Sequence, residues 1–264
     1  MIRSVGAWIG RGIRRALRLI GIAAFRERAG YHYVPDYYGR SAGKHDDIRT
    51  LPVFGQLAND TIAQQRTLLY YDRLYTIYQA LRHVKNLPAS RHGFNIAEVG
   101  VYKGGTSYFM ASMIDAIDLK PTGLHCFDTF EGHPGEDIRT QFNGAHVAKT
   151  FGDTSFEAVQ GYLSRFNNVA LYKGRFQETC HQVESLKFHF VHLDVDIYEP
   201  MTFALDFFDS RLVVGGSIVV DDYGFLTCPG VKQAVTKFLA SQRNYFSLHL
   251  LTGQNILIKT SREG

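Results

Sequence analysis

The chain has 264 residues, of which 45% are hydrophobic and 20% charged. The length fits one α/β domain with an extension better than two full domains, and the composition is that of an ordinary globular protein. The formal net charge of +4 is unevenly distributed. Residues 1–28 contain seven Arg and one Glu, so the rest of the chain is mildly acidic. We therefore expect no nucleic-acid partner for that acidic body.

The three cysteines are odd in number and widely spaced, with no C-x-x-C motif: Cys126, Cys180 and Cys228. This spacing predicts reduced thiols, rather than a disulfide framework or a cysteine-based zinc site. A cytoplasmic protein is the expectation that follows.

Residues 1–28 are predicted to form a basic amphipathic helix. Apolar residues recur at steps of three and four between positions 2 and 25, and arginines gather on the opposite face. The arginines interrupt this stretch too often for a transmembrane span or a signal peptide. Two interpretations stay open: peripheral contact of residues 2–25 with an anionic membrane surface or a partner, or docking on the protein's own body as a packing or homo-oligomerisation element.

Residues 29–60 lack sustained periodicity and are rich in Tyr, Gly and Asp. We expect an irregular segment there, and such long segments are usually functional or mobile. The pattern then predicts one long helix over residues 62–84, beginning after Asp60 and Thr61.

From residue 95 onward, short apolar runs alternate with amphipathic stretches. Strands are expected at 95–99, 123–127, 168–172, 188–193, 213–220, 246–250 and 255–259. Helices are expected at 105–118, 155–165, 177–184, 199–210 and 230–241. Near-continuous apolar strands separated by helices indicate an α/β fold, a parallel sheet with helices on both faces. Only a short loop separates the last two runs, so the last strand is expected to be antiparallel.

A glycine-containing turn follows the first predicted strand and reads E-x-G-x-x-x-G-G-T-S over residues 98–107. Glycines let the backbone turn tightly, and amides at a helix N-terminus offer donors to an anionic group. The spacing differs from the G-x-G-x-x-G dinucleotide fingerprint. The leading Glu98 instead suits a cationic amino-acid moiety. The second predicted strand ends at Asp128, the position where doubly wound folds bind ribose hydroxyls.

Four carboxylates follow the fourth and fifth predicted strands: Asp194, Asp196, Asp221 and Asp222. Both strand ends fall at the carboxyl edge of the sheet, where ligands bind. Like charges at short range repel unless a cation shares the site, and carboxylate oxygens suit a hard ion such as Mg²⁺, Mn²⁺ or Ca²⁺. A metal site is therefore predicted, against the alternative that these acids only cap helices. His189 and His192, within the fourth strand, are interpreted as packed, hydrogen-bonded residues.

Several of these segments resemble the macrocin O-methyltransferase family, the TylF, MycF and NovP type of sugar O-methyltransferase. The segments that carry the resemblance are Glu98–Ser107, Phe127–Gly132, Lys173–Thr179, Leu193–Pro200 and Asp221–Val235. The resemblance extends from about Thr61 to the C-terminal strands. It implies that residues 61–264 form a class I methyltransferase domain, with a Rossmann-like sheet of seven strands. Members of this family fold an N-terminal segment over the site as a lid, so the resemblance makes residues 29–60 a candidate lid.

The resemblance also implies an activity: transfer of a methyl group from S-adenosylmethionine to a hydroxyl, with Mg²⁺ or Mn²⁺. The acceptor it implies is a small molecule or glycan, and specifically a sugar of a glycosylated natural product or glycan. Asp194, Asp221 and Asp222 match the metal ligands, and Asp196 matches a proposed general base, which makes Asp194 and Asp196 the candidate catalytic pair. The positions matched to cofactor binding are Glu98, Gly100, Tyr102, Gly105, Thr106, Ser107, Asp128, Thr129, Gly174 and Phe176.

Three alternatives are weighed against this reading. A catechol-type phenol acceptor would use the same metal and a similar fold. A nicotinamide-dependent reductase lacks support, because the G-x-G-x-x-G spacing is missing. A non-catalytic, membrane-associated protein with the same fold would have no need of the acidic residues.

Overall fold

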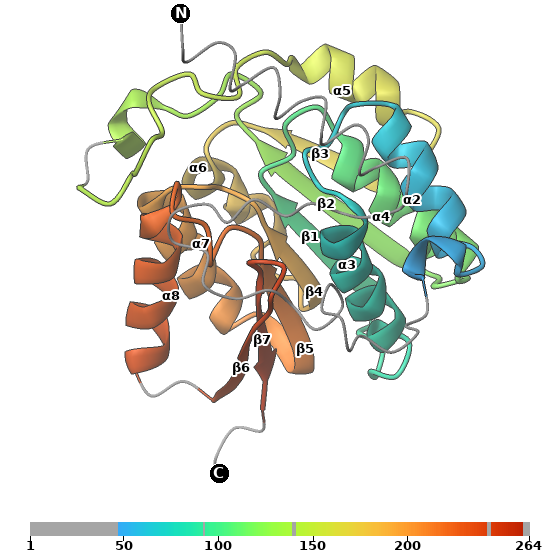
Figure 1. The fold of residues 1–264 in the computed structure, drawn as a ribbon. Coiled ribbons are helices and arrows are strands. Elements are labelled where there is room, and N and C mark those ends of the chain that lie inside the picture. The colour runs from blue at the N-terminus through green and yellow to red at the C-terminus, as the bar shows by residue number, and fades with distance from the viewer. Residues whose placement is uncertain (1–46, 92, 139–140, 242–243, 261–264) are drawn as a thin grey trace, which may run out of the picture. The chain divides into compact units, whose positions relative to one another are not determined.

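The computed structural model describes residues 47–91, 93–138, 141–241 and 244–260. They form a seven-stranded sheet with the order β3-β2-β1-β4-β5-β7-β6 (Figure 1). The strands are β1 (Phe94–Val99), β2 (Thr122–Asp128), β3 (Val169–Lys173), β4 (Phe188–Leu193), β5 (Leu212–Val220), β6 (Tyr245–His249) and β7 (Asn255–Lys259). The first five are parallel, and β7 runs antiparallel between β5 and β6. The predicted fold class is confirmed.

Helices cover both faces of the sheet (Figure 1). They are α2 (Phe54–Ala63), α3 (Tyr71–Val84), α4 (Gly105–Ala116), α5 (Phe156–Leu163), α6 (Phe176–Thr179), α7 (Tyr198–Asp209) and α8 (Pro229–Ala240). Short 3₁₀ helices lie at η2 (Ile48–Thr50), η3 (Gly135–Ile138) and η4 (Cys180–Val183). No helix in these described ranges is long and apolar enough to cross a membrane.

Each face of the sheet has its own hydrophobic core, because side chains alternate between the faces along each strand. Ile96 and Phe190 pack in the core with α2, α3 and α4. Ala97 and Val191, one residue further along the same strands, pack with α7 and α8 in the other core. The central strands β1 and β4 are therefore apolar on both faces, as parallel strands covered by two helical layers must be.

The predicted single helix over 62–84 is wrong. The chain is helical from Phe54 to Ala63, turns through residues 64–70, and becomes helical again at Tyr71. Gln65 has a positive φ of 55°, and the Arg66 carbonyl accepts a hydrogen bond of 3.2 Å from the amide of Gly105. The break is thus caused by a tertiary contact with the start of α4, which local periodicity does not reveal.

The predicted irregular segment is also wrong at its C-terminal end, since α2 begins at Phe54. Phe54, Ala58 and Thr61 are buried at helical spacing, so small and polar residues concealed an amphipathic pattern. The predicted basic helix and residues 29–46 of the predicted irregular segment lie outside the described residues.

Candidate active site

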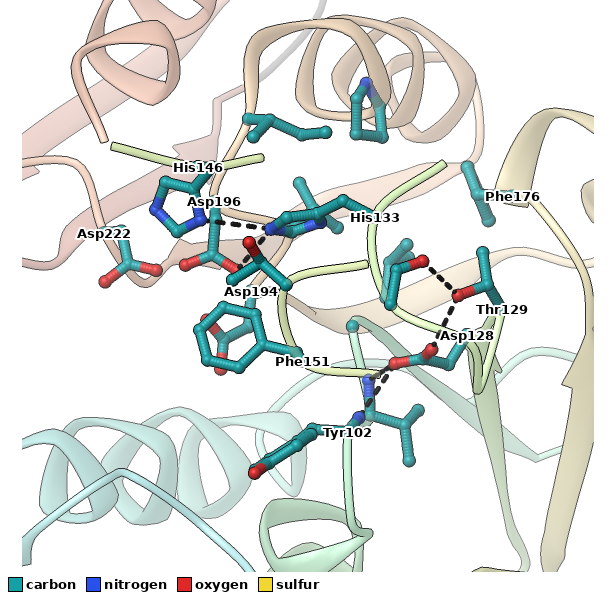
Figure 2. Close-up of a pocket in the computed structure, with 18 of the residues that line it drawn as sticks. Tyr102, Asp128, Thr129, His133, His146, Phe151, Phe176, Asp194, Asp196 and Asp222 are labelled. Atoms are coloured by element: carbon teal, nitrogen blue, oxygen red, sulfur yellow. Dashed lines mark hydrogen bonds and ion pairs between the residues drawn. The ribbon is translucent and has the colours of Figure 1, made fainter. Parts of the chain in front are cut away.

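A pocket of about 290 Å³ opens at the carboxyl ends of the central strands. After β1 the chain places β2 and β3 on one side, and it returns to place β4 and β5 on the other. The loops that leave β1 and β4 therefore diverge, and the crevice at such a switch point is where doubly wound folds bind ligands. Figure 2 shows the side chains that meet there.

The turn between β1 and α4 forms the floor of the pocket. Gly100 has a φ of +93°, and a Cβ at this position would overlap the carbonyl oxygen of Asp194. Only glycine lets the two strand ends approach this closely. Gly104, also at positive φ, precedes the first residue of α4. Both glycines are thus required by backbone geometry.

Asp128, at the end of β2, holds this turn in place by hydrogen bonds to its backbone. Its Oδ2 accepts hydrogen bonds from the amides of Val101 and Tyr102, at 2.7 and 2.8 Å, and its Oδ1 accepts one from the amide of Phe130 at 2.6 Å. Figure 2 shows the carboxylate facing the backbone at Tyr102. Burial raises the pKa of Asp128, although these amide donors oppose the shift. Three amides thus leave little of its acceptor capacity for a ligand.

The residues predicted to bind the cofactor separate into two groups. The pocket is lined by Gly100, Tyr102, Thr106, Asp128, Thr129, Gly174 and Phe176. Glu98, Gly105 and Ser107 are buried and are not among the lining residues. The hydroxyl of Ser107 donates to Glu98 behind the turn. Their role in cofactor binding stays a prediction.

Three carboxylates meet at the ends of β4 and β5: Asp194, Asp221 and Asp222, which we call the acidic cluster. One oxygen of each lies within 4.8 Å of the others. The amide of Asp194 donates to the Val99 carbonyl, and that of Asp221 donates to the Leu193 carbonyl, both at 2.9 Å. These bonds continue the backbone hydrogen bonding of the sheet just beyond the ends of β4 and β5, and they bring the carboxylates together.

Asp221 and Asp222 are buried and Asp194 is half-buried, and the pKa values of the three carboxylates are shifted in different directions. Burial and the neighbouring Asp221 and Asp222 carboxylates raise the pKa of Asp194 well above its ordinary value. The pKa of Asp222 is raised by burial and by Asp221. Burial opposes ionisation of Asp221 too, but His192 and Arg73 lower its pKa. Arg73 and His192 therefore offset the charge of Asp221 but not the mutual repulsion of the three carboxylates.

Arg73, on the first turn of α3, was not predicted as a site residue. Its guanidinium donates to Asp221 Oδ2 and lies 3.8 Å from Asp222, while its Nη2 donates to the Leu68 carbonyl at 2.8 Å. In the sequence it is one of several arginines in a predicted helix, and only the break before α3 directs it into the pocket. No sequence signal distinguished it.

His192 is fully buried within β4, as the interpretation of a packed residue requires. Its neighbours are nevertheless acidic: Nδ1 lies 3.3 Å from Glu98, and Nε2 lies 3.7 Å from Asp221 without a hydrogen bond. Burial alone would lower the pKa of His192, but the two carboxylates raise it to about 10. A buried imidazolium thus links the glycine turn to the acidic cluster.

His189 conforms to the packed interpretation. Its Nδ1 accepts from the Asn95 amide, and its Nε2 faces the Pro88 carbonyl, both at 3.1 Å. One nitrogen accepts and the other donates, so the ring is neutral and its polar atoms are satisfied.

A second group of ligand-type side chains joins the predicted Asp196 to two histidines that were not predicted. His133, His146 and Asp196 each place one ligand atom within 4.8 Å of the others, and all three line the pocket. Both histidines belong to the connection between β2 and α5, in which η3 is the one described regular element. A connection of this length in a compact domain is itself a functional signal, and it was available in the sequence.

The comparisons with known proteins agree with this architecture. The family model for macrocin-O-methyltransferase (TylF) matches residues 54–249. Demethyldecarbamoylnovobiocin O-methyltransferase of Streptomyces niveus is 27% identical over 191 residues, which cover 69% of this chain and 70% of that protein. A 4'-O-methyltransferase of Streptomyces olivaceus, acting on 8-demethyl-8-(2,3-dimethoxy-alpha-L-rhamnosyl)-tetracenomycin-C, is 28% identical over 142 residues, 51% of this chain and 54% of its own.

Among solved structures, that of the O-methyltransferase NovP is similar, with a TM-score of 0.64 and 23% identity. The similarity covers 74% of this chain and 83% of NovP, and at this identity it shows the fold. The family model, in contrast, spans most of the chain and includes the glycine turn and all four aspartates. The chain belongs to the macrocin-O-methyltransferase family.

Proposed function

We propose that this protein transfers a methyl group from S-adenosylmethionine to a sugar hydroxyl of a glycosylated natural product or glycan, with the aid of a divalent metal ion. The observation that carries the proposal is that the glycine turn and two members of the acidic cluster, Asp194 and Asp222, line one pocket. Family membership supports methyl transfer. The rhamnosyl group in the name of the Streptomyces olivaceus relative supports a sugar acceptor.

The S-adenosylmethionine half of the pocket would be the turn after β1 and the ends of β2 and β3. When bound, this cofactor supplies an electrophilic methyl group. The chain's part is to orient it: Gly100 allows close approach of the backbone, and Phe176 offers an apolar wall that is held edge-on against Phe127 at 5.1 Å. Collinear placement of acceptor oxygen, methyl carbon and sulfur is the main requirement for such a displacement.

The acidic cluster fits Mg²⁺ or Mn²⁺. Its donors are carboxylate oxygens, which hard divalent ions prefer. With Glu98 it carries four negative charges when ionised, whereas Arg73 and His192 contribute two positive charges. A divalent ion would balance the remainder, and Asp194, Asp221 and Asp222 would hold it. Held by these three carboxylates, such an ion would position a hydroxyl acceptor and lower its pKa.

Asp196 is the proposed general base. It lines the pocket two residues after Asp194, and burial together with Asp222 raises its pKa well above the ordinary value. A carboxylate that holds a proton more firmly than usual is better suited to accept one from a hydroxyl near neutral pH. Its place in the pocket and its raised pKa thus support Asp196 as the proton acceptor.

The decisive experiment is a methyl-transfer assay with S-adenosylmethionine and Mg²⁺, comparing glycosylated acceptors with catechols. We expect sugar methylation that chelation abolishes. Asp222→Asn should reduce turnover at least about 100-fold, the scale for losing one preorganised electrostatic group, and should still bind S-adenosylhomocysteine. The matched control is Asp115→Asn, at an exposed carboxylate beside Lys120. Full activity in chelator would contradict the metal role, and a preference for catechols would contradict the acceptor.

A further inference from the structure

His133, His146 and Asp196, together the histidine cluster, stand beside the acidic cluster but share no member with it. Nε2 of His133 lies 3.1 Å from Nδ1 of His146 and 3.8 Å from Oδ2 of Asp196. Figure 2 shows the two rings next to the Asp196 carboxylate, with Asp222 beyond it. Two imidazole nitrogens and a carboxylate oxygen thus converge on one point at the pocket wall.

These separations suit a small metal ion. A tetrahedral ion with nitrogen and oxygen ligands about 2.0–2.1 Å away places neighbouring ligand atoms ~3.3 Å apart. The two measured spacings lie on either side of that value, so small shifts in side-chain torsions would suffice. The remaining ring nitrogen of His146 lies 3.3 Å from Cys228 Sγ, and a partner of this kind fixes ring orientation at metal sites.

The rings are also held in place before any ligand arrives. The His133 amide donates to the Thr150 carbonyl at 3.0 Å, and the His133 carbonyl accepts from the Lys149 amide at 2.9 Å. Phe151 contacts both rings, with centroids 5.6 Å from His133 and 6.0 Å from His146. Because the backbone and an aromatic neighbour fix both histidines, little ordering would be needed on binding.

The donor chemistry distinguishes this cluster from its neighbour. Imidazole nitrogens favour divalent transition ions, whereas the all-oxygen acidic cluster favours Mg²⁺. For a given nitrogen-containing site, Zn²⁺ also binds more tightly than Mn²⁺ or Fe²⁺. The two clusters would therefore select different ions from the same solution.

We propose that His133, His146 and Asp196 form a second metal site, which takes Zn²⁺, and that its occupation inhibits methyl transfer. The ion would bind Asp196 Oδ2, so this carboxylate could no longer accept a proton from the acceptor hydroxyl. The inhibitory part rests on the proposed function, because it needs Asp196 as the base. The binding part stands without it. The cysteine spacing gave no indication of zinc, because none of the three proposed ligands is a cysteine.

Binding is tested with Zn²⁺ and with Co²⁺ as its spectroscopic probe, both in excess Mg²⁺. We expect one tightly held Zn²⁺ per chain, and the intense visible bands of four-coordinate Co²⁺ with nitrogen ligands. His133→Gln and His146→Gln should each weaken Zn²⁺ binding at least about 10-fold, the lower end for disturbing a metal site. The matched control, His181→Gln at an exposed histidine, should bind as the wild type does, and so should Asp221→Asn.

Several outcomes would overturn the proposal. One is the absence of tight Zn²⁺ binding, in which case the cluster is a hydrogen-bonded histidine pair. Another is loss of binding in Asp221→Asn but not in the histidine variants, which would place the ion in the acidic cluster. Weak, six-coordinate Co²⁺ bands in the wild type alone would also decide against it, even if the variants failed to fold.

The inhibition is tested separately, as the ratio of methyl-transfer rates with and without Zn²⁺ in excess Mg²⁺. In the wild type and in His181→Gln, Zn²⁺ should lower the rate at least about 10-fold. In His146→Gln the rates with and without Zn²⁺ should be nearly equal. Tight Zn²⁺ binding with undiminished activity would refute inhibition while leaving the site. Absence of any methyl transfer would refute the proposed function, and the binding experiment would still decide the site.

Discussion

Asp221 and Asp222 are adjacent in sequence, yet their pKa values are displaced in opposite directions. Asp221 lies between two cations, Arg73 and His192, and accepts a 2.8 Å hydrogen bond from the side-chain amide of Gln254. Asp222 lies farther from the Arg73 guanidinium, at 3.8 Å. These adjacent carboxylates thus differ in their surroundings: Asp221 is held by the protein's own cations, whereas Asp222 lines the pocket.

We predict that His192→Leu lowers the free energy of unfolding by about 3–5 kcal/mol at pH 7, the cost of leaving buried carboxylates without their cation. Urea denaturation measures this change in the free energy of unfolding, with His181→Gln as the control. His192 has a raised pKa in the folded state, so its stabilisation is complete below its ordinary pKa of 6.5 and is lost as the pH rises toward about 10. The variant should lack this alkaline loss, and an unchanged pH dependence would contradict the imidazolium.

Arg73 and a metal ion would compete for the same negative charge. We predict that Arg73→Met tightens Mg²⁺ binding at least about 10-fold, because two unit charges near a protein surface interact with up to ~4 kcal/mol at 4 Å and tenfold needs about 1.4 kcal/mol. Calorimetric titration with Mg²⁺ measures the dissociation constant. The matched control is Arg82→Met, because Arg82 lies on the same helix but is exposed. Weaker binding in Arg73→Met would show that the arginine supports the site.

At the scale of elements, the strands were predictable to within about a residue and the path around the pocket was not. Parallel strands buried on both faces are continuous apolar runs, so sequence alone locates them. The break between α2 and α3 depends on Arg66 meeting Gly105, residues far apart in the chain. The four aspartates were predictable because strand ends are. His133, His146 and Arg73 come from a long connection and a helix start, whose positions depend on tertiary contacts.

The turn between β1 and α4 gives a prediction about backbone geometry. Gly100→Ala combines an unfavourable positive φ with a collision against the Asp194 backbone, so it should lower the free energy of unfolding by roughly 2–5 kcal/mol. It should also weaken S-adenosylhomocysteine binding. Gly161→Ala is the control, because Gly161 lies within α5 and a Cβ there meets nothing within 4 Å. That change should stabilise by about 0.5–1 kcal/mol, and equal effects of the two would contradict the argument.

For the whole molecule, the pocket is a meeting point of elements that the sheet order alone brings together. The glycine turn belongs to β1, the acidic cluster to β4 and β5, and the histidine cluster largely to the connection after β2. The switch in strand order makes these three neighbours. Ligand binding at this junction should therefore stabilise the entire sheet, because the ligand touches loops from several strands at once.

Thermal unfolding measures that coupling. A ligand at 100 times its dissociation constant stabilises the folded state by ~2.7 kcal/mol, and in a chain of this size each kcal/mol raises the melting temperature by about 2–4 °C. We therefore predict that S-adenosylhomocysteine raises the melting temperature by roughly 5–10 °C. NADH should have no comparable effect, because the glycine turn lacks the dinucleotide spacing. The increase should vanish in Gly100→Ala and persist in Gly161→Ala; an equal increase with NADH would mean that the turn recognises nucleotides in general rather than this donor.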